Sequence, residues 1–239
     1  MNSLSYQIIV RNSSQTAQYF YVFQKRATFQ PPTTPGAISS CSLGCQNVGN
    51  YGSSGAQIVF GLDRQIYAGA ISTALPPPPQ STASNSMSTS RFLVNISTAK
   101  QAISLTTDAG SNPPTNFTEL ALNPLGLSEP VYQSGILVGA FAVKVPSYTP
   151  TPAPQLFCGV AAVSADQTVI LSSFIAPAPN ATMSCAPEQI FFVKTGYQPV
   201  GSILTYDESN SARCDFTTGF NSITATYNSN GTFSTAGGP

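Results

Sequence analysis

The stretch Tyr19–Phe23 (YFYVF) decides the fold class of this chain, because it has the composition of a strand and is apolar on both faces. A strand of an antiparallel sheet with one face in water alternates apolar and polar residues, so this stretch must be covered on both sides. Gly135–Val143 (GILVGAFAV) and Ile190–Val193 (IFFV) share this property. A second sheet, long loops, a partner subunit or a ligand could provide the cover. The glycines and alanines of Gly135–Val143 leave space that fits either tight sheet packing or a cavity.

Segments of period 2, bounded by Gly, Pro, Asn and Ser, recur along the chain and predict strands rather than helices. The segment 116–122 (NFTELAL) is the one helical candidate, and it predicts a single turn or a loop because Pro124 follows it. The proline-rich stretches 76–90 and 147–154 predict loops, since proline cannot donate a ladder hydrogen bond. We expect strands near residues 5–11, 18–25, 56–68, 91–97, 101–106, 135–145, 156–163, 167–174, 188–195, 200–206, 212–216 and 222–227.

These patterns together predict an all-β fold, a single-domain antiparallel β-sandwich with long Pro/Ser/Thr-rich loops. The chain has 239 residues, and all-β units often reach about 200 to 250 residues without dividing into domains. We expect one β-sandwich domain over residues 1–233. The remaining residues, 234–239 (STAGGP), are predicted to form a disordered tail.

Charge is scarce, because 8% of the residues are charged whereas about a quarter are in an average globular chain. Nine basic residues balance nine acidic ones, which removes the attraction on which binding to nucleic acids and anionic membranes depends. We therefore expect no nucleic acid and no membrane as partners. A net charge near zero also makes a homo-oligomer physically easy, because it weakens repulsion between copies.

Residues 1–15 lack the basic region and the long apolar core of a signal peptide, which predicts a cytoplasmic protein. Five cysteines are present, and in that compartment they are expected to be free thiols rather than a disulfide framework.

The absence of histidine excludes more chemistry than any motif suggests. Ser-His-Asp and Cys-His catalysis need an imidazole, and so do histidine-ligated zinc, iron and haem sites. A zinc site of four thiolates needs two closely spaced pairs, but the sequence has no second pair beside Cys41 and Cys45. The glycine-rich stretch 49–55 lacks the residues of a phosphate-binding loop and predicts a turn. We expect no metal and no cofactor.

Charged residues inside apolar strands are candidates for a functional site, because burying a charge costs free energy unless the charge is paired or used. In Ile58–Tyr67 (IVFGLDRQIY), alternation places Asp63, Gln65 and Tyr67 on one face. This polar face is either a site or an ordinary solvated surface. The opposite face of the same stretch carries Phe60, Leu62, Arg64 and Ile66.

Lys144 and Lys194 each end an apolar strand. Either lysine could reach the surface with its aliphatic stem packed below, or act as a base or a Schiff-base amine.

The two ends of the chain resemble the family of rhizosphere-expressed (RhiA-like) proteins. The resemblance implies an all-β fold but no particular activity, since the family has no settled biochemical function. It rests on Tyr6–Ser14 (YQIIVRNSS), Phe20–Gln24 (FYVFQ), Phe60–Asp63 (FGLD), Ile190–Gly201 (IFFVKTGYQPVG), Cys214–Phe216 (CDF) and Asn230–Phe233 (NGTF).

Three functions fit these residues. The leading hypothesis is binding of a small, largely apolar molecule in a cavity between the sheets or at their end. The first alternative is a cofactor-independent isomerase or cyclase for a lipophilic intermediate, with Asp63 as acid or base and Tyr67 or Lys144 polarising a carbonyl group. The second is a lectin-like or self-assembling protein. For the cavity, the expected polar groups are Asp63, Tyr67, Tyr21 and Lys144, and the expected walls are Phe23, Phe60 and Phe141.

Overall fold

The computed structural model describes residues 5–31, 37–74, 95–108, 113–150, 155–163 and 168–238. The predicted loop over 76–90 lies outside the described residues, as do most of the predicted strand 91–97 and the end of the stretch 147–154.

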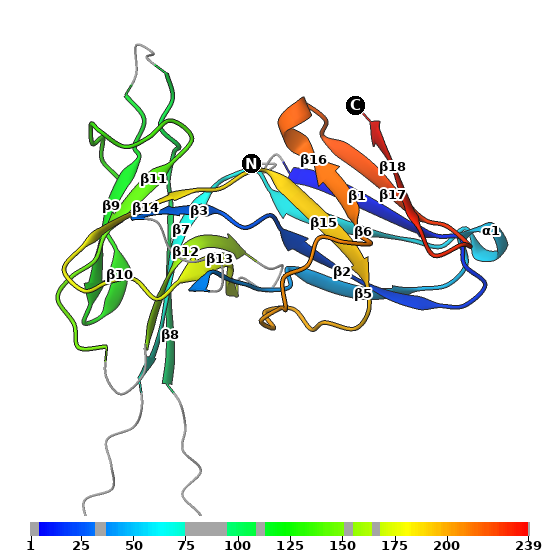
Figure 1. Cartoon of the computed structure of the whole chain (residues 1–239), viewed down its shortest axis with the longest axis horizontal. Coiled ribbons are helices and arrows are strands. Elements are labelled where there is room, and N and C mark those ends of the chain that lie inside the picture. The colour runs from blue at the N-terminus through cyan, green and yellow to red at the C-terminus, as the bar shows by residue number, and fades with distance from the viewer. Residues whose placement is uncertain are drawn as a thin grey trace, which may run out of the picture.

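The described chain consists mainly of β-strands, arranged as two sandwich-like halves that lie side by side (Figure 1). The first half, on the right in Figure 1, packs two four-stranded sheets against each other. One sheet has the order β18 (Phe233–Gly238), β17 (Ser222–Tyr227), β1 (Ser5–Asn12), β6 (Gln57–Asp63). The other has the order β16 (Ala212–Asp215), β15 (Ile190–Thr195), β2 (Gln18–Gln24), β5 (Gly44–Val48).

The second half, on the left in Figure 1, packs two five-stranded sheets around a separate core. The predicted all-β, sandwich-like fold class is confirmed. One sheet has the order β10 (Leu125–Leu127), β9 (Phe117–Leu122), β11 (Phe141–Lys144), β14 (Thr182–Ala186), β3 (Thr28–Gln30). The other has the order β4 (Ser39–Ser40), β13 (Val169–Ile175), β12 (Leu156–Val163), β7 (Tyr67–Ala74), β8 (Asn95–Ala102).

Four short segments carry the chain directly from a strand of one half into a strand of the other. They join β2 to β3, β4 to β5, β6 to β7, and β14 to β15. Strand pairs among the described residues are antiparallel with two exceptions, β1 with β17 and β9 with β11. A one-turn helix, α1 (Tyr51–Ser54), joins β5 to β6 within the predicted turn 49–55, and a short 3-10 helix, η2 (Phe216–Thr218), follows β16.

The doubly apolar strands β2 and β15 are covered on both faces, as predicted. Phe20 and Val22 of β2 point into the core between the two sheets of the first half. Phe23 points to the opposite face and stacks on Phe192 of β15, with ring centroids 5.4 Å apart. The cover on that outer face includes Leu204 and Tyr206 of the segment between β15 and β16, so a loop supplies it rather than a further sheet.

The predicted strand 135–145 is wrong over its first part, because β11 covers only Phe141–Lys144. Gly135 and Gly139 have φ angles of +83° and +79°, in the left-handed region that favours glycine, and they form turns before the strand. Apolar residues between them are consequently exposed on turns, as Leu137 and Val138 are.

The predicted helical turn or loop at 116–122 is also wrong, since Phe117–Leu122 forms β9. Pairing with β10 and β11 on its two sides overrides the weak local preference.

The predicted strand 200–206 is reduced to a single bridge between Cys41 and Ile203. The predicted disordered tail is wrong for residues 234–238, which continue β18 and pair with β17. An adjacent strand with free backbone groups is sufficient to order such a small, polar sequence.

Among the described residues, no helix is long and apolar enough to cross a membrane.

Candidate functional site

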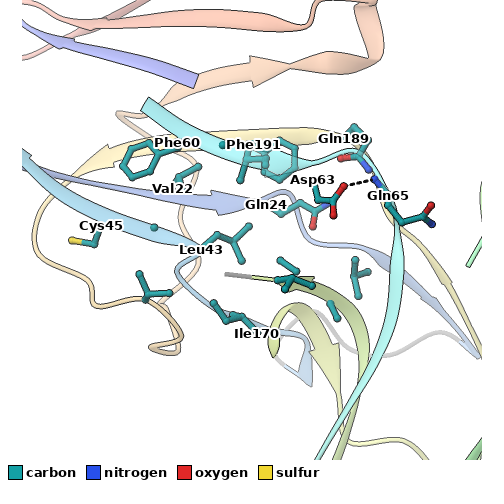
Figure 2. Close-up of a pocket in the computed structure, with 18 of the residues that line it drawn as sticks. Val22, Gln24, Leu43, Cys45, Phe60, Asp63, Gln65, Ile170, Gln189 and Phe191 are labelled. Atoms are coloured by element: carbon teal, nitrogen blue, oxygen red, sulfur yellow. Dashed lines mark hydrogen bonds between the residues drawn. The ribbon is translucent and has the colours of Figure 1, made fainter. Parts of the chain in front are cut away.

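A cleft of about 570 Å³ lies between the two halves (Figure 2). Strands β2, β5, β6 and β15 of the first half form one side, and β12 and β13 of the second half form the other. Its apolar lining includes Val22, Leu43, Phe60, Leu62, Val160, Ile170 and Phe191, and its polar lining includes Gln24, Cys45, Asp63, Gln65 and Gln189.

The polar end of the cleft forms where β6 stops and the chain bends toward β7. The Asp63 carboxylate accepts a hydrogen bond from the backbone N–H of Gln65 at 3.0 Å, which closes the bend in the manner of an Asx turn. Its other oxygen accepts a hydrogen bond from the hydroxyl of Tyr67 at 3.1 Å. Asp63 is therefore held in place by two donors from its own segment.

The hydroxyl of Tyr67 remains a hydrogen-bond donor at neutral pH. Burial raises the pKa of Tyr67, and the hydrogen bond to Asp63 and the negative charge of Asp63 raise it further. The ammonium nitrogen of Lys100 lies 5.4 Å from the centre of the Tyr67 ring, in a cation–π contact. The guanidinium of Arg64 turns away to the ring of Tyr6, 4.6 Å from its centre.

Two glutamine amides add polar groups to the same cleft. Gln24 is buried, and both ends of its amide are bonded: Nε2 donates to the carbonyl of Glu188 at 2.9 Å, and Oε1 accepts from Ser172 at 2.7 Å. Gln189 differs, because its Oε1 atom is buried and accepts no hydrogen bond from the described residues. Figure 2 places Gln189 at the same end of the cleft as Asp63 and Gln65.

The structure brings together only part of the predicted site. Asp63 and Phe60 line the cleft, and Tyr67 is bonded to Asp63. Tyr21 and Phe23 point instead to the outer face of β2, where their rings stack with centroids 5.8 Å apart.

Lys144 and Phe141 lie in β11 of the second half, and neither lines the cleft. Phe141 is fully buried in the core of that half. Lys144 forms an exposed ion pair with Glu119 of β9 at 3.1 Å. Lys194 likewise forms an ion pair, with Asp207.

The sequence reasoning missed Gln24, Gln189 and Cys45, which reach the cleft from three different strands or strand ends. Gln24 carried one usable signal, because it is a polar residue at the end of a doubly apolar strand. Gln189 and Cys45 carried none, since they line the cleft through tertiary packing alone. Among the described residues, no three cysteine, aspartate or glutamate side chains gather as a metal site would require.

Cys45 gives the cleft a chemical reporter. All five cysteines are free thiols, and Cys45 is half-buried on the cleft wall whereas the other four are buried. Burial raises the pKa of Cys41 to about 11 and those of Cys158 and Cys214 to about 12, which suppresses their reactive thiolate forms.

We expect iodoacetamide at pH 8 to alkylate Cys45 at least about tenfold faster than any other cysteine, as followed by peptide mass spectrometry. In a Cys45→Ser variant, labelling should be slow until urea unfolds the chain. First labelling at Cys41 or Cys158 in the folded protein would contradict the described burial.

In comparisons with known proteins, no family model, no curated protein and no solved structure matches the chain. By its structure the protein belongs to the all-β class, with a sandwich-like fold and a cleft between two halves. The resemblance to the RhiA-like family stays a prediction.

Proposed function

We propose that the protein binds a small, largely apolar molecule in the cleft between its two halves. The observation that carries this proposal is the division of the cleft into apolar walls and one polar end. Ligand sites in proteins are commonly concave, about 300 to 1,000 Å³ in volume, apolar for the most part, and provided with a few polar groups that fix orientation. A volume of about 570 Å³ falls within that range.

Filling the cleft should abolish binding, and position 61 offers a way to fill it. Gly61 lines the cleft, and a Cβ atom added there would have no atom within 4 Å. We expect Gly61→Phe to raise the dissociation constant of Nile red, a neutral apolar dye, at least about tenfold, because the ring takes the place of the dye. Fluorescence titration measures this constant.

Gly126→Phe is the matched control, because Gly126 lies in β10 of the second half and the nearest atom to its added Cβ is 3.9 Å away. This variant should bind the dye as the unaltered protein does. Equal binding by a folded Gly61→Phe protein, checked by circular dichroism, would overturn the proposed location of the site.

A cofactor-independent isomerase or cyclase is the second candidate, and one observation favours it. Asp63 presents a carboxylate to an apolar cleft, where it could transfer a proton to or from a bound lipophilic substrate. Lys144 has no part in this version, because it pairs with Glu119 in the second half. An isomerase would convert a bound candidate substrate and lose that conversion in Asp63→Asn, whereas a binding protein would return the molecule unchanged.

A further inference from the structure

Among the described residues that line the cleft, Asp63 is the only charged one, and its charge is negative. Asp63 takes part in none of the ion pairs among the described residues. These pairs are Lys25–Glu188, Lys144–Glu119, Lys194–Asp207 and Arg213–Asp215. Within the described part of the chain, this half-buried carboxylate thus faces an apolar space without a basic side chain at ion-pair distance.

The carboxylate also has unused capacity for hydrogen bonds. An ionised carboxylate only accepts, at about four lone-pair positions, and Asp63 receives two bonds, from the Gln65 N–H and the Tyr67 hydroxyl. The buried Oε1 of Gln189, at the same end of the cleft, is a second acceptor without a donor among the described residues. Asp63 can therefore accept further hydrogen bonds from a ligand, whereas its neighbours close the Gln189 oxygen off from the cleft.

We infer that the ligand carries a protonated amine on an apolar body, and that Asp63 receives its N–H groups. This inference rests on the proposed function of the cleft. An ammonium group supplies several donors and the counter-charge together, which an alcohol cannot. A carboxylate or phosphate would instead meet the like charge of Asp63 in a partly desolvated site. The apolar body of the ligand then lies along the more exposed apolar residues of the lining, Leu43, Val59 and Ile66.

Three probes of equal chain length separate these chemistries: octylamine, 1-octanol and octanoate, each used at pH 7 to displace Nile red from the full chain. We expect octylamine to displace the dye at about one tenth of the octanol concentration, the effect of one partly solvated charge-assisted hydrogen bond. Octanoate should be the weakest of the three. In Asp63→Asn, which keeps an oxygen for the Gln65 N–H, octylamine should fall to the level of octanol while octanol itself is unchanged.

Two further variants assign the preference to the charge of Asp63. Gln189→Met removes a neutral, buried acceptor at the same end of the cleft, and should leave the preference for octylamine within about twofold of the parent protein, because a ligand cannot reach that oxygen. Glu119→Gln removes one negative charge in the second half, and should leave the preference intact. The inference would be overturned if octylamine displaced Nile red no better than octanol, or if the Asp63→Asn protein still preferred octylamine. Either result would leave the cleft a binding site. If neither the dye nor any probe binds, the proposed function itself fails.

Discussion

Replacing Gly159 with alanine should lower the free energy of unfolding by about 3 kcal/mol or more, because there is no room for a side chain at this position. Gly159 lies in β12 between β7 and β13. An added Cβ would lie 2.1 Å from the carbonyl oxygen of Ser173 and 2.8 Å from the Cα of Phe174. Both are backbone atoms, so no rotamer change can relieve the clash, and the paired strands must separate.

Urea unfolding followed by circular dichroism measures this loss, and Gly61→Ala is its matched control. Gly61 is also a strand glycine, but its added Cβ would meet nothing within 4 Å. The control should stay within about 1 kcal/mol of the parent and could gain stability, since alanine reduces the freedom of the unfolded chain. If the Gly159→Ala protein does not fold at all, the loss of unfolding free energy is larger than expected and the prediction still holds. Unfolding of both variants at the same urea concentration would show that β12 is not packed as described.

Phe141→Ala should cost about 4 kcal/mol of unfolding free energy, the usual range for deleting a fully buried phenylalanine ring. The Phe141 side chain is 0% exposed and lies in the core of the second half with Val143 and Met183. Truncation removes the transfer free energy of the ring and leaves a cavity, because β9 and β14 hold β11 on both sides.

The same variant separates a structural role from the ligand contact that the sequence predicted for Phe141. Nile red should bind the folded Phe141→Ala protein with the parental dissociation constant, because Phe141 does not line the cleft. Leu137→Ala, at a nearby residue that is 55% exposed, should change the unfolding free energy by about 0.5 kcal/mol or less. Loss of dye binding with an unchanged unfolding curve would place Phe141 at the ligand after all.

Strands in which the two faces can be told apart from the sequence were predictable, because side chains alternate between the two faces of a strand. Phe20 and Val22 face one core and Phe23 the other side, as expected for Tyr19–Phe23. The segment Phe117–Leu122 was not predictable in this way. Its short pattern and the following Pro124 resemble a helix end, and it becomes a strand through partners distant in sequence.

Asp63 and Tyr67 were predicted to lie on the same face of one strand, and the structure brings them together in a different way. Alternation along one continuous strand 56–68 placed the two residues on a common face. The strand in fact ends at Asp63, and the bend that its carboxylate closes with Gln65 brings Tyr67 within hydrogen-bond distance. Ile170 could not be assigned to the cleft beforehand, because β13 belongs to the second half and joins the cleft only once the two halves pack together. Gln189 directly precedes β15, and it joins Asp63 through the packing of the two sheets of the first half.

The parallel pairing of β1 with β17 sets an order of events during synthesis. Gln7–Asn12 aligns with Ser222–Tyr227, so one strand leaves the ribosome long before its neighbour exists. Antiparallel β6 can join β1 early, but the opposite edge of β1 stays open until the late part of the chain arrives. All strands of the second half lie between these two partners in the sequence and can be paired by then. The half that carries β1 therefore completes its fold last. Until β17 pairs with it, the open edge of β1 must be protected from pairing with other nascent chains.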